Sequence, residues 1–494
     1  MFVVDDILKA VSGSKVIQQG ATSPIIPAAS IDSRNVGKGE FFFAVQGASR
    51  DGHDFVNQAF NVGAGGAIIS RAVHSDFHDR TIVMVPDTVR ALAQTAQHVR
   101  TRYAPYVVAV TGSVGKTTTK SILAHILESG CKVHCSKRSF NNQYGVPLTI
   151  LSLGPDQTHL VAEVGANHSG EIASLCAILK PNMALLTAIG YAHIEHFGSL
   201  DETLKAKMEI VESLSPDGIV VLNGDDLRLL SRVSAVRARG HRVVCSGRGK
   251  SNDFRALAVV SGEHGSNGIL SYGGQDVPFH FPLLGEHLLG SCLLASAAAA
   301  GCGINLDVIA ERLATVSVTK GRMDLRIVSP YLQILDDSYN ASPDAVEAAL
   351  RTLGLLDTPT RIAVLGTMRE LGSFSRECHE HVGRVTAEHA THLIAIGEGA
   401  SAMIEGAAQG GLSVGNCEVA ASAADALDAV QAALSGASGR VSVLVKGSRF
   451  IHTERVVLGL CGTSIGCRLE SCPKYIHCSG CDDLEKRNVE HRSL

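Results

Sequence analysis

The chain alternates short apolar runs with segments in which apolar residues recur at helical spacing. From residue 107 to about residue 324, strand-like runs such as HLVAEV and MALLTAI are separated by helical patterns. This alternation predicts a parallel sheet with crossover helices, and such sheets place ligand sites at the carboxyl ends of their strands. Four later runs, LQILDD, RIAVLG, HLIAIG and VSVLVKG, predict a second α/β unit that ends near residue 460.

The start of the chain has a different pattern. Short strand-like runs, FFFAV, GAIIS and TIVMV, are separated by turns, and the segment TVRALAQTAQHVRTRY then carries apolar residues at helical spacing. We place a domain boundary at this helix. The predicted division is an N-terminal domain over residues 1–86, a central domain over 87–324, a third domain over 325–460 and a tail over 461–494.

The composition of the chain limits the kinds of molecule that the protein is expected to bind. The chain has 494 residues, a net charge of −4 and 19% charged residues, with no run of lysine or arginine, so it does not indicate a nucleic-acid partner or a basic membrane-binding face. The N-terminus lacks a basic segment followed by a long apolar core, and the alanine-rich run 293–300 is too short to span a bilayer. We expect a cytoplasmic protein without membrane insertion, and we expect a monomer.

Cysteines are unevenly distributed. Eight of the thirteen lie in apolar contexts that indicate small core residues. The other five lie in the last 34 residues and are Cys461, Cys467, Cys472, Cys478 and Cys481. One C-x-x-C pair and the adjacent His477 are compatible with a zinc site, but a second C-x-x-C is absent. Because the segment also lacks helical or strand periodicity, we predict a mobile tail, with zinc binding as the alternative.

The stretch VVAVTGSVGKTTTKSIL joins a β-branched strand to a helix through two glycines. Gly112 and Gly115 permit backbone angles that turn amide N–H groups toward an anion, and Lys116 adds a positive charge at the helix start. A plain glycine turn would explain the glycines but not the G-K-T-T sequence behind an apolar strand. Val110 stands where the general phosphate-loop pattern has a glycine, so the loop is a shortened variant. The residues predicted to hold a nucleotide phosphate are Thr111, Gly112, Ser113, Val114, Gly115, Lys116, Thr117 and Thr118.

Two later strands end in candidate metal ligands. Glu163 ends the apolar run HLVAEV, where a carboxylate can share Mg²⁺ with the Thr117 hydroxyl across neighbouring strand ends; a solvated surface charge is the alternative. After MALLTAI, His193 and His196 form an H-x-x-H pair around Glu195. This spacing also occurs in zinc sites, but Mg²⁺ fits a nucleotide site better, and a surface loop with histidines remains open.

Eight motifs occur in the order found in one family of ligases. They are TGSVGKTTTK, FNNQYGVPLTIL, EVGANHSGEIA, AHIEHFGSLDETLKAKMEI, KGRMDL, DDSYNASPDAVEAAL, VLGTMRELG and VKGSR. On these motifs the chain resembles the Mur ligases over nearly everything except the tail, and IDSRNVGKGEFFFAVQGASRDGHDF resembles the family's uridine-nucleotide module. The resemblance implies an α/β protein with three domains, including a central P-loop ATPase domain with a parallel sheet and a C-terminal Rossmann-like domain.

The segments GANHSGEI and NNQYGVP are most similar to the branch of the family that adds a dipeptide. The resemblance implies an ADP-forming ligase of peptidoglycan synthesis that uses ATP and Mg²⁺. The γ-phosphoryl group of ATP would pass to the terminal carboxylate of UDP-N-acetylmuramoyl tripeptide, and the amine of D-alanyl-D-alanine would attack the acyl phosphate. Two other hypotheses stay open: a related ligase that adds a different amino acid, and a nucleotide-dependent switch that hydrolyses ATP without ligation.

The resemblance also implies roles for individual residues. Catalytic roles fall to Lys116, His193 and Lys207, and Mg²⁺ ligation to Thr117, Glu163, His193 and Lys207. ATP contacts beyond the loop are expected from Asn142, Arg322, Asp337 and Tyr339, uridine-nucleotide contacts from Asp32, Ser33 and Arg34, and peptide contacts in the cleft from Lys446, Ser448 and Arg449. Four positions depart from the family pattern around nucleotide or acceptor contacts: Leu288, Ser291, Ser342 and Thr367.

Lys207 is expected to be carbamylated. It lies fourteen residues after His193, the spacing at which Mur ligases carry a lysine modified by CO₂. An ammonium group cannot ligate Mg²⁺, whereas a carbamate presents two hard oxygens and a negative charge. Without the resemblance, Lys207 would be interpreted as a solvated charge on an amphipathic helix, like Lys205 beside it.

Overall fold

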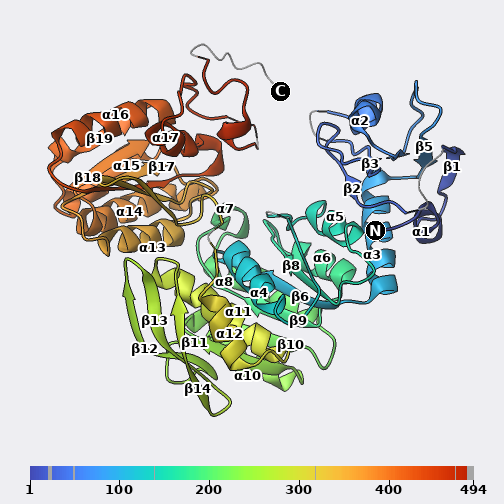
Figure 1. Cartoon of the computed structure of the whole chain (residues 1–494), viewed down its shortest axis with the longest axis horizontal. Coiled ribbons are helices and arrows are strands. Elements are labelled where there is room, and N and C mark those ends of the chain that lie inside the picture. Colours follow the sequence, from blue (N-terminus) through green and yellow to red (C-terminus); the bar gives the residue numbers. More distant parts are fainter. Residues whose placement is uncertain are drawn as a thin grey trace.

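The computed structural model describes residues 1–20, 25–47, 50–137, 139–317, 319–472, 474 and 476–486. Its strands form sheets of five, nine and six strands, and Figure 1 shows the N-terminal sheet standing apart from the other two. Helices connect the parallel strands in all three parts of the chain. The α/β fold class predicted from the alternating pattern is therefore confirmed.

The N-terminal sheet has the order β1-β5-β4-β3-β2. β2 to β5 pair in parallel, and β1 pairs antiparallel to β5. Phe41 and Phe43 are buried in one core and Phe42 in another, because successive side chains of a strand point to opposite faces. The elements are α1 (Val4–Ala10), β1 (Lys15–Gln18), β2 (Ala29–Ser30), β3 (Phe41–Phe43), η1 (Gly52–Phe55), α2 (Val56–Val62), β4 (Gly66–Ile69) and β5 (Thr81–Met84).

Helix α3 (Thr88–Tyr103) links this sheet to the next. Asp87 caps its first turn by accepting a hydrogen bond of 2.9 Å from the backbone N–H of Arg90, and Ala104 ends it in the left-handed conformation, with φ 45°. The buried face of α3 packs into a core that contains strands of both sheets. The helix predicted from apolar spacing is thus observed, and it joins the first two sheets through shared packing.

The central sheet has the order β14-β13-β12-β11-β10-β9-β6-β8-β7. The strands from β7 to β12 pair in parallel, as predicted. The strands are β6 (Tyr106–Thr111), β7 (Val133–Cys135), β8 (His159–Glu163), β9 (Met183–Leu186), β10 (Ile219–Asn223), β11 (Arg242–Gly247), β12 (Phe254–Gly262), β13 (Gly265–Tyr272) and β14 (Gln275–Phe281).

Two antiparallel strands extend this sheet, which the predicted parallel pattern did not include. β12, β13 and β14 pair antiparallel, and the β13–β14 turn consists of Gly273 and Gly274, whose φ angles are 60° and 81°. Two glycines with positive φ match the twist of a tight hairpin. β14 forms one edge of the sheet and exposes Asp276 and Pro278.

Helices cover both faces of the central sheet. Val108 and Val110 of β6 face the core that holds α4, α11 and α12, whereas Val107 and Ala109 face the core that holds α3, α5, α6 and α8. The helices are α4 (Lys116–Leu127), α5 (Gly145–Leu151), α6 (Glu171–Leu179), α7 (Ile194–Phe197), α8 (Leu200–Glu212), α9 (Leu227–Leu230), α10 (Val233–Ala238), α11 (Glu286–Gly301) and α12 (Leu306–Leu313). Since both faces are buried, β6 is apolar throughout its interior.

The third sheet has the order β15-β16-β20-β17-β18-β19, with β15 antiparallel to β16 and the other strands parallel. Its strands are β15 (Asp324–Ser329), β16 (Leu332–Asp336), β17 (Thr360–Gly366), β18 (His392–Ile396), β19 (Cys417–Ala420) and β20 (Val441–Lys446). The helices are α13 (Pro343–Gly354), η2 (Gly372–Phe374), α14 (Ser375–His389), α15 (Ala400–Gln409), η3 (Val414–Asn416), α16 (Ala423–Gly436), η4 (Arg449–Ile451) and α17 (Glu454–Leu460). One of its cores is continuous with the core of the central sheet.

The described part of the tail contacts the third sheet's domain. The backbone N–H of Cys472 donates to the carbonyl of Phe450 at 2.8 Å, and Arg455 Nη1 donates to the carbonyl of Leu469 at 2.8 Å. A short helix, η5 (Cys478–Gly480), lies against α17. These contacts, which the lack of periodicity did not indicate, attach the tail to the start of α17.

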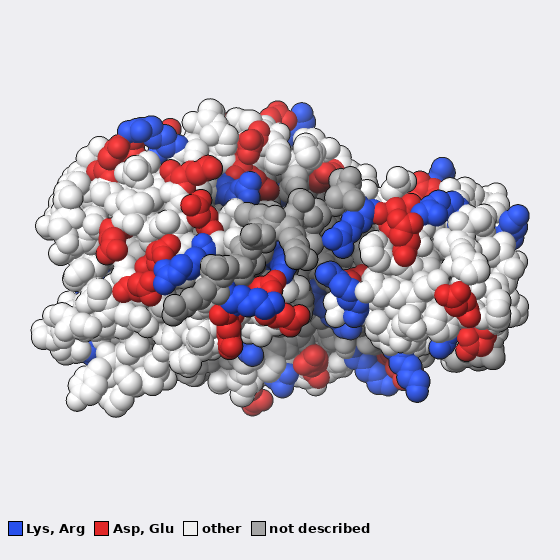
Figure 2. Space-filling view, turned by 90° about the horizontal axis from the view of Figure 1, so that it is seen from above, with Lys and Arg blue, Asp and Glu red and all other residues white. Residues whose placement is uncertain are grey.

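Charge is distributed in small groups. Figure 2 shows Lys and Arg interspersed with Asp and Glu over the face displayed, with several basic side chains where the N-terminal part on the right adjoins the larger body. Within the part of the chain that the structure describes, no helix has the length and apolarity needed to cross a membrane.

Candidate active site

The loop between β6 and α4 has a positive φ, a conformation that favours glycine, at two positions. Gly112 has φ 141° and Gly115 has φ 80°. A Cβ on Gly112 would lie 2.0 Å from Thr187 Oγ1, and one on Gly115 would lie 3.1 Å from Ser291 Oγ. α4 begins immediately after this loop, so the free amides of its first turn point toward it. The loop therefore has the backbone features of an anion-binding site, and phosphate binding stays a prediction.

The end of β9 fixes the same loop. Thr187 Oγ1 donates a hydrogen bond of 2.5 Å to the carbonyl of Val114. Ser113 Oγ donates to the carbonyl of Gly190 at 3.1 Å and accepts from the backbone N–H of Gly190 at 2.9 Å. Thr111 is the last residue of β6 and is buried. These bonds hold the loop in place before any ligand binds.

Lys116 lies over the loop at the first position of α4. Its Nζ donates to the carbonyls of Gly112 at 2.7 Å and Ser113 at 3.1 Å. Burial lowers the pKa of Lys116, and the nearby Glu163 carboxylate acts in the opposite direction. The side chain thus carries its positive charge at the point where the loop would hold a phosphate.

Thr117 and Glu163 form a pair of hard oxygen donors beside the loop. Thr117 Oγ1 donates a hydrogen bond of 2.7 Å to Glu163 Oε2, and Asn141 Nδ2 donates one of 2.8 Å to Oε1. Glu163 is 1% exposed, so the interpretation as a solvated surface charge is wrong. A buried carboxylate and a hydroxyl at adjacent strand ends fit Mg²⁺, which prefers oxygen ligands. Asn141 was not predicted, although it stands in the quoted segment FNNQYGVP.

Asn142, which was predicted to contact ATP, has a structural role in this conformation. Its Oδ1 accepts hydrogen bonds from the backbone N–H groups of Tyr144 at 3.2 Å and Gly145 at 2.9 Å, at the start of α5. The side chain is otherwise exposed. The neighbouring Asn141, rather than Asn142, reaches the carboxylate of Glu163.

Lys207 is buried on α8, with 1% exposure. Its Nζ donates to the carbonyl of Ala166 at 3.2 Å and lies 5.0 Å from the ring centroid of Phe197. Burial lowers the pKa of Lys207 to about 7. Lys205, by contrast, is exposed and pairs with Glu202. The interpretation of Lys207 as one more solvated charge is therefore wrong.

His193 faces the third domain. It has φ 62°, and its Nδ1 forms a short contact with Glu370 Oε2. This contact lowers the pKa of the Glu370 carboxyl. His196 instead lies beside His168, with ring centroids 5.0 Å apart and ring planes inclined by 45°. Among the described residues no hydrogen bond joins His193 to Thr117, Glu163 or Lys207, so its metal role stays a prediction.

Two residues from the region of the third sheet reach the phosphate loop. Arg322 stacks on the ring of Tyr339 at 4.2 Å from its centroid. Arg322 Nη2 donates to Ser139 Oγ at 3.3 Å, and the Tyr339 hydroxyl donates to the same atom at 3.0 Å. Ser139 Oγ lies 3.4 Å from Thr117 Oγ1. The structure thus brings Arg322 and Tyr339 to Ser139, beside Thr117, and their contact with ATP stays a prediction.

Asp337 and Lys446 form a buried ion pair at the ends of β16 and β20. Lys446 Nζ also donates to the carbonyl of Asn340 at 2.9 Å, and Asp337 Oδ1 accepts from the backbone N–H of Met323 at 3.2 Å. These contacts lie at the carboxyl edge of the third sheet. Asp337 was predicted for ATP and Lys446 for the peptide, and here the two residues bind each other.

Ser448 and Arg449 follow β20. Ser448 Oγ accepts a hydrogen bond of 3.0 Å from the backbone N–H of Arg369 and is 3% exposed. Arg449 Nη1 donates to Glu454 Oε1 at 3.2 Å, and its guanidinium carbon lies 5.8 Å from the ring centroid of Tyr339. Arg449 therefore adjoins the residues that reach the phosphate loop.

The predicted uridine-nucleotide residues lie in the N-terminal domain, after β2. Arg34 forms two hydrogen bonds with the carboxylate of Asp32, at 2.9 and 3.0 Å, which lowers the pKa of that carboxyl. Ser33 Oγ donates to Gln58 Oε1 at 2.8 Å. Figure 1 shows β2 well separated from α4. These residues and the phosphate loop therefore belong to different parts of the molecule.

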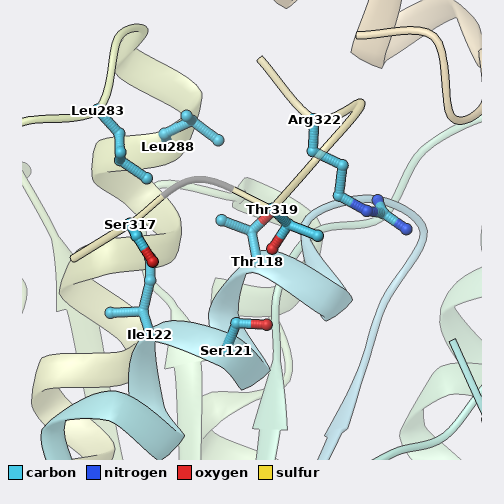
Figure 3. Close-up of a pocket in the computed structure, with 8 residues that line it drawn as sticks. All are labelled: Thr118, Ser121, Ile122, Leu283, Leu288, Ser317, Thr319 and Arg322. Carbon is cyan, nitrogen blue, oxygen red and sulfur yellow. The ribbon is translucent and has the colours of Figure 1, made fainter. Parts of the chain in front are cut away.

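A hollow lies beside the first turns of α4 (Figure 3). It is bounded by α4, the start of α11 and the segment that leads to β15. Its lining residues are Thr118, Ser121, Ile122, Leu283, Leu288, Ser317, Thr319 and Arg322. Leu288, one of the four departures from the family pattern, gives this hollow an apolar wall. Nearby His287 is half-buried, and desolvation lowers its pKa to about 4.

Three family models match consecutive parts of the chain. The model of the Mur ligase family, catalytic domain, matches residues 26–104. The Mur ligase middle domain matches residues 110–300, and the Mur ligase, glutamate ligase domain, matches residues 321–449. The matches extend from the N-terminal sheet to Arg449.

Two known ligases are similar over most of their length. The UDP-N-acetylmuramoyl-tripeptide--D-alanyl-D-alanine ligase of Escherichia coli is 34% identical over 438 residues, which cover 88% of this chain and 94% of that protein. The ligase of the same name from Bacillus subtilis is 31% identical, with coverage of 88% and 93%. A crystal structure of MurF from Acinetobacter baumannii superposes with a TM-score of 0.82 at 30% identity, covering 94% of this chain and 99% of that chain. MurF of Thermotoga maritima in complex with ADP has a TM-score of 0.75 at 27% identity, with coverage of 88% and 96%.

Proposed function

Because this chain belongs to the Mur ligase family, we propose that it is the ATP-dependent, ADP-forming ligase that joins D-alanyl-D-alanine to UDP-N-acetylmuramoyl tripeptide in peptidoglycan synthesis. The similar ligases of Escherichia coli and Bacillus subtilis carry this activity in their names and match nearly their full length. The ADP complex of the Thermotoga maritima structure supports the use of ATP.

The proposed reaction has two steps. A carboxylate oxygen of the tripeptide attacks the γ-phosphorus of ATP, the bond to the bridging oxygen breaks, and ADP leaves. The amine nitrogen of D-alanyl-D-alanine then attacks the carbonyl carbon of the acyl phosphate, phosphate leaves, and the amine loses a proton. One amide bond forms for each ATP that is split, and the product is UDP-N-acetylmuramoyl pentapeptide.

The phosphate loop supplies the electrostatic part of this chemistry. Its amides and the ammonium group of Lys116, which lies over the loop carbonyls, would stabilise negative charge on the phosphates. Thr117 and Glu163 would hold one Mg²⁺, and His193 with a carbamylated Lys207 would hold another. Such ions neutralise charge on the phosphates of the nucleotide.

The strongest structural support for the proposal is that Ser139 contacts both Thr117 and Tyr339. It connects the loop of the central domain to a residue that follows β16 of the third domain. ATP bound at the loop would therefore be in reach of Arg322 and Tyr339. We assign Asp337 and Asn142 to the surroundings of the nucleotide.

The substrates would enter from two sides. Asp32, Ser33 and Arg34 would bind the uridine nucleotide, whereas Lys446, Ser448 and Arg449 would form the side of the cleft that faces the peptide. The proposal also includes a monomeric protein that acts in the cytoplasm.

One assay tests donor and acceptor together. The protein is incubated with ATP, Mg²⁺, D-alanyl-D-alanine and a UDP-N-acetylmuramoyl tripeptide ending in either meso-diaminopimelate or lysine, while phosphate release and product mass are followed. We expect pentapeptide and phosphate in equal amounts with at least one tripeptide. Matched reactions omit the dipeptide, or supply UDP-N-acetylmuramoyl dipeptide with a single diamino acid.

The outcomes separate the three hypotheses. If product forms from UDP-N-acetylmuramoyl dipeptide and the diamino acid, but not from either tripeptide, the protein is a ligase that adds a single amino acid. Phosphate release that ignores both peptide substrates would favour a nucleotide-dependent switch. Absence of pentapeptide from both tripeptides would overturn the proposed function.

A further inference from the structure

Three side chains with metal-binding atoms meet where the tail contacts α17. His452 Nδ1, a carboxylate oxygen of Glu454 and Cys478 Sγ all lie within 4.8 Å of one another, and all three residues are buried. His452 Nδ1 is 2.9 Å from Glu454 Oε1 and 3.4 Å from Cys478 Sγ. Glu454 begins α17, His452 lies two residues before it and Cys478 lies in η5, so the tail supplies one member of the cluster.

These spacings match the donor spacings around one zinc ion. Zinc bonds of about 2.0–2.3 Å in tetrahedral geometry place neighbouring donor atoms roughly 3.3–3.7 Å apart. The two observed separations, 2.9 and 3.4 Å, lie within a few tenths of an ångström of that range. A nitrogen, an oxygen and a sulfur donor together suit a borderline cation such as Zn²⁺ better than Mg²⁺, which prefers oxygen alone.

The histidine ring is oriented for ligation through Nδ1. Its Nε2 lies 3.2 Å from the carbonyl of Cys472, which can only accept, so Nε2 carries the hydrogen. Cys472 is itself fixed by its backbone hydrogen bond to Phe450. In the neutral ring Nδ1 therefore keeps a lone pair that faces the Glu454 carboxylate, and such an arrangement needs a proton or a cation between the two.

One oxygen of the Glu454 carboxylate is buried without a hydrogen-bond partner among the described residues. Oε1 accepts from Arg449 Nη1 and from the backbone N–H of Cys478, each at 3.2 Å. Oε2 is buried and has no hydrogen-bond partner among the described residues. An unpaired buried carboxylate oxygen costs free energy, and a bound cation would remove that cost. This observation points to a ligand independently of the cluster's geometry.

We propose that His452, Glu454 and Cys478 bind one Zn²⁺ ion that fastens the tail to the third domain. Binding breaks the S–H bond of Cys478, forms a zinc–sulfur bond and releases the proton to solvent. The carboxylate and the thiolate then balance the charge of the ion. All three residues are buried, so the ion would lie away from solvent between α17 and η5, and the site does not depend on the proposed ligase activity.

The site differs from the one considered from sequence alone. From the sequence, the zinc ligands considered were all in the tail: the C-x-x-C pair Cys478 and Cys481, and His477. In the structure, His477 is exposed and its Nδ1 contacts Ser479. Two ligands instead come from the segment just after Arg449, and Glu454 connects the ion to that arginine.

The test uses the full chain, purified without a polyhistidine tag. Zinc is measured by mass spectrometry of the metal after gel filtration, and we expect about one ion per chain. Cobalt exchanged for zinc should give the near-ultraviolet absorption of a thiolate–cobalt bond. Cys478→Ser, His452→Ala and Glu454→Gln should each lose most of the bound metal, whereas Cys461→Ser and His477→Ala should retain it.

Circular dichroism identifies variants that fail to fold. The cobalt spectrum of the wild-type chain tests the site even if every variant fails to fold. A wild-type chain that takes up no zinc from an equimolar solution would overturn the proposal. So would a cobalt complex without thiolate absorption, or a folded Cys478→Ser variant that binds zinc as the wild type does.

Discussion

The Thr117 hydroxyl donates a 2.7 Å hydrogen bond to the Glu163 carboxylate across the ends of two neighbouring parallel strands. Val110, near the end of β6, pairs with Glu163 at the end of β8, so the loop that follows β6 starts beside this carboxylate. The register of the sheet places Glu163 beside the start of the loop, and the first turn of α4 brings Thr117 back to this carboxylate.

Replacing Glu163 by glutamine keeps the shape of the side chain and removes its charge. We expect turnover to fall on the order of 10²-fold, as for the loss of one preorganised charge, and the Mg²⁺ concentration for half-maximal rate to rise. Phosphate release measured over a Mg²⁺ titration checks both. Glu128→Gln, at an exposed carboxylate, is the matched control and should leave the titration unchanged.

Lys116→Ala removes the ammonium group that lies over the loop. Turnover should fall about 10²-fold or more, because in the proposed function this charge would stabilise the phosphates as negative charge develops. Steady-state pentapeptide formation gives the rate, and circular dichroism shows whether the fold is kept. Lys132→Ala, which removes an exposed lysine, is the control. A folded Lys116→Ala variant with a near-normal rate would show that the loop only shapes the backbone.

Lys207→Ala should lose most activity, since it removes the expected carbamate. Acetate or formate should partly restore turnover by occupying the vacated oxygen positions, while Lys205→Ala should behave as the wild type because Lys205 is exposed. Carbon-13 NMR of protein kept in labelled bicarbonate should show a carbamate signal that the Lys207→Ala variant lacks. Full activity of that variant in bicarbonate-free buffer would contradict the assignment.

The same lysine gives a pH prediction. Burial lowers the pKa of Lys207 to about 7, so the amine is mainly protonated below that pH and mainly neutral above it. Only the neutral amine reacts with CO₂, and we therefore expect the activity of the wild type to rise as pH increases through about 7. Formate stays ionised over this range, so the formate-rescued Lys207→Ala variant should lack that rise. Parallel profiles from pH 6 to 8.5 compare the two.

Tyr339→Phe removes the hydroxyl that donates to Ser139 while keeping the ring on which Arg322 stacks. Loss of one hydrogen bond costs about 1 kcal/mol, so the KM for ATP should rise about fivefold with little change in kcat. Tyr331→Phe is the control, because Tyr331 is 71% exposed. An unchanged KM for ATP would show that the Tyr339 hydroxyl does not contribute to nucleotide binding.

Local pattern predicted the parts of the site that depend on strand ends. Gly112, Gly115 and Glu163 were found because glycine spacing and a carboxylate after an apolar strand are local signals, and parallel strands bring such ends together. The burial of Lys207 also had a local signal. Residues three and four positions away on both sides of it, Thr203, Leu204, Ile210 and Val211, are buried on the same face of α8.

The contacts between domains could not be predicted in this way. His193 meets Glu370, 177 residues away, and Ser139 meets Tyr339, 200 residues away. Such pairs depend on how the sheets pack against one another. The spacing of apolar residues within a single segment does not contain that information. The same holds for His452 and Cys478, where a segment without periodicity folds back on α17.

The hairpin that extends the central sheet has a consequence for how the chain behaves at high concentration. β14 is an edge strand, and an open edge offers unpaired backbone groups with which a strand of another molecule can pair. Pro278 removes one backbone donor from this edge, and the exposed charge of Asp276 opposes a second copy of itself. The widest sheet of the molecule therefore ends in a strand that resists intermolecular aggregation.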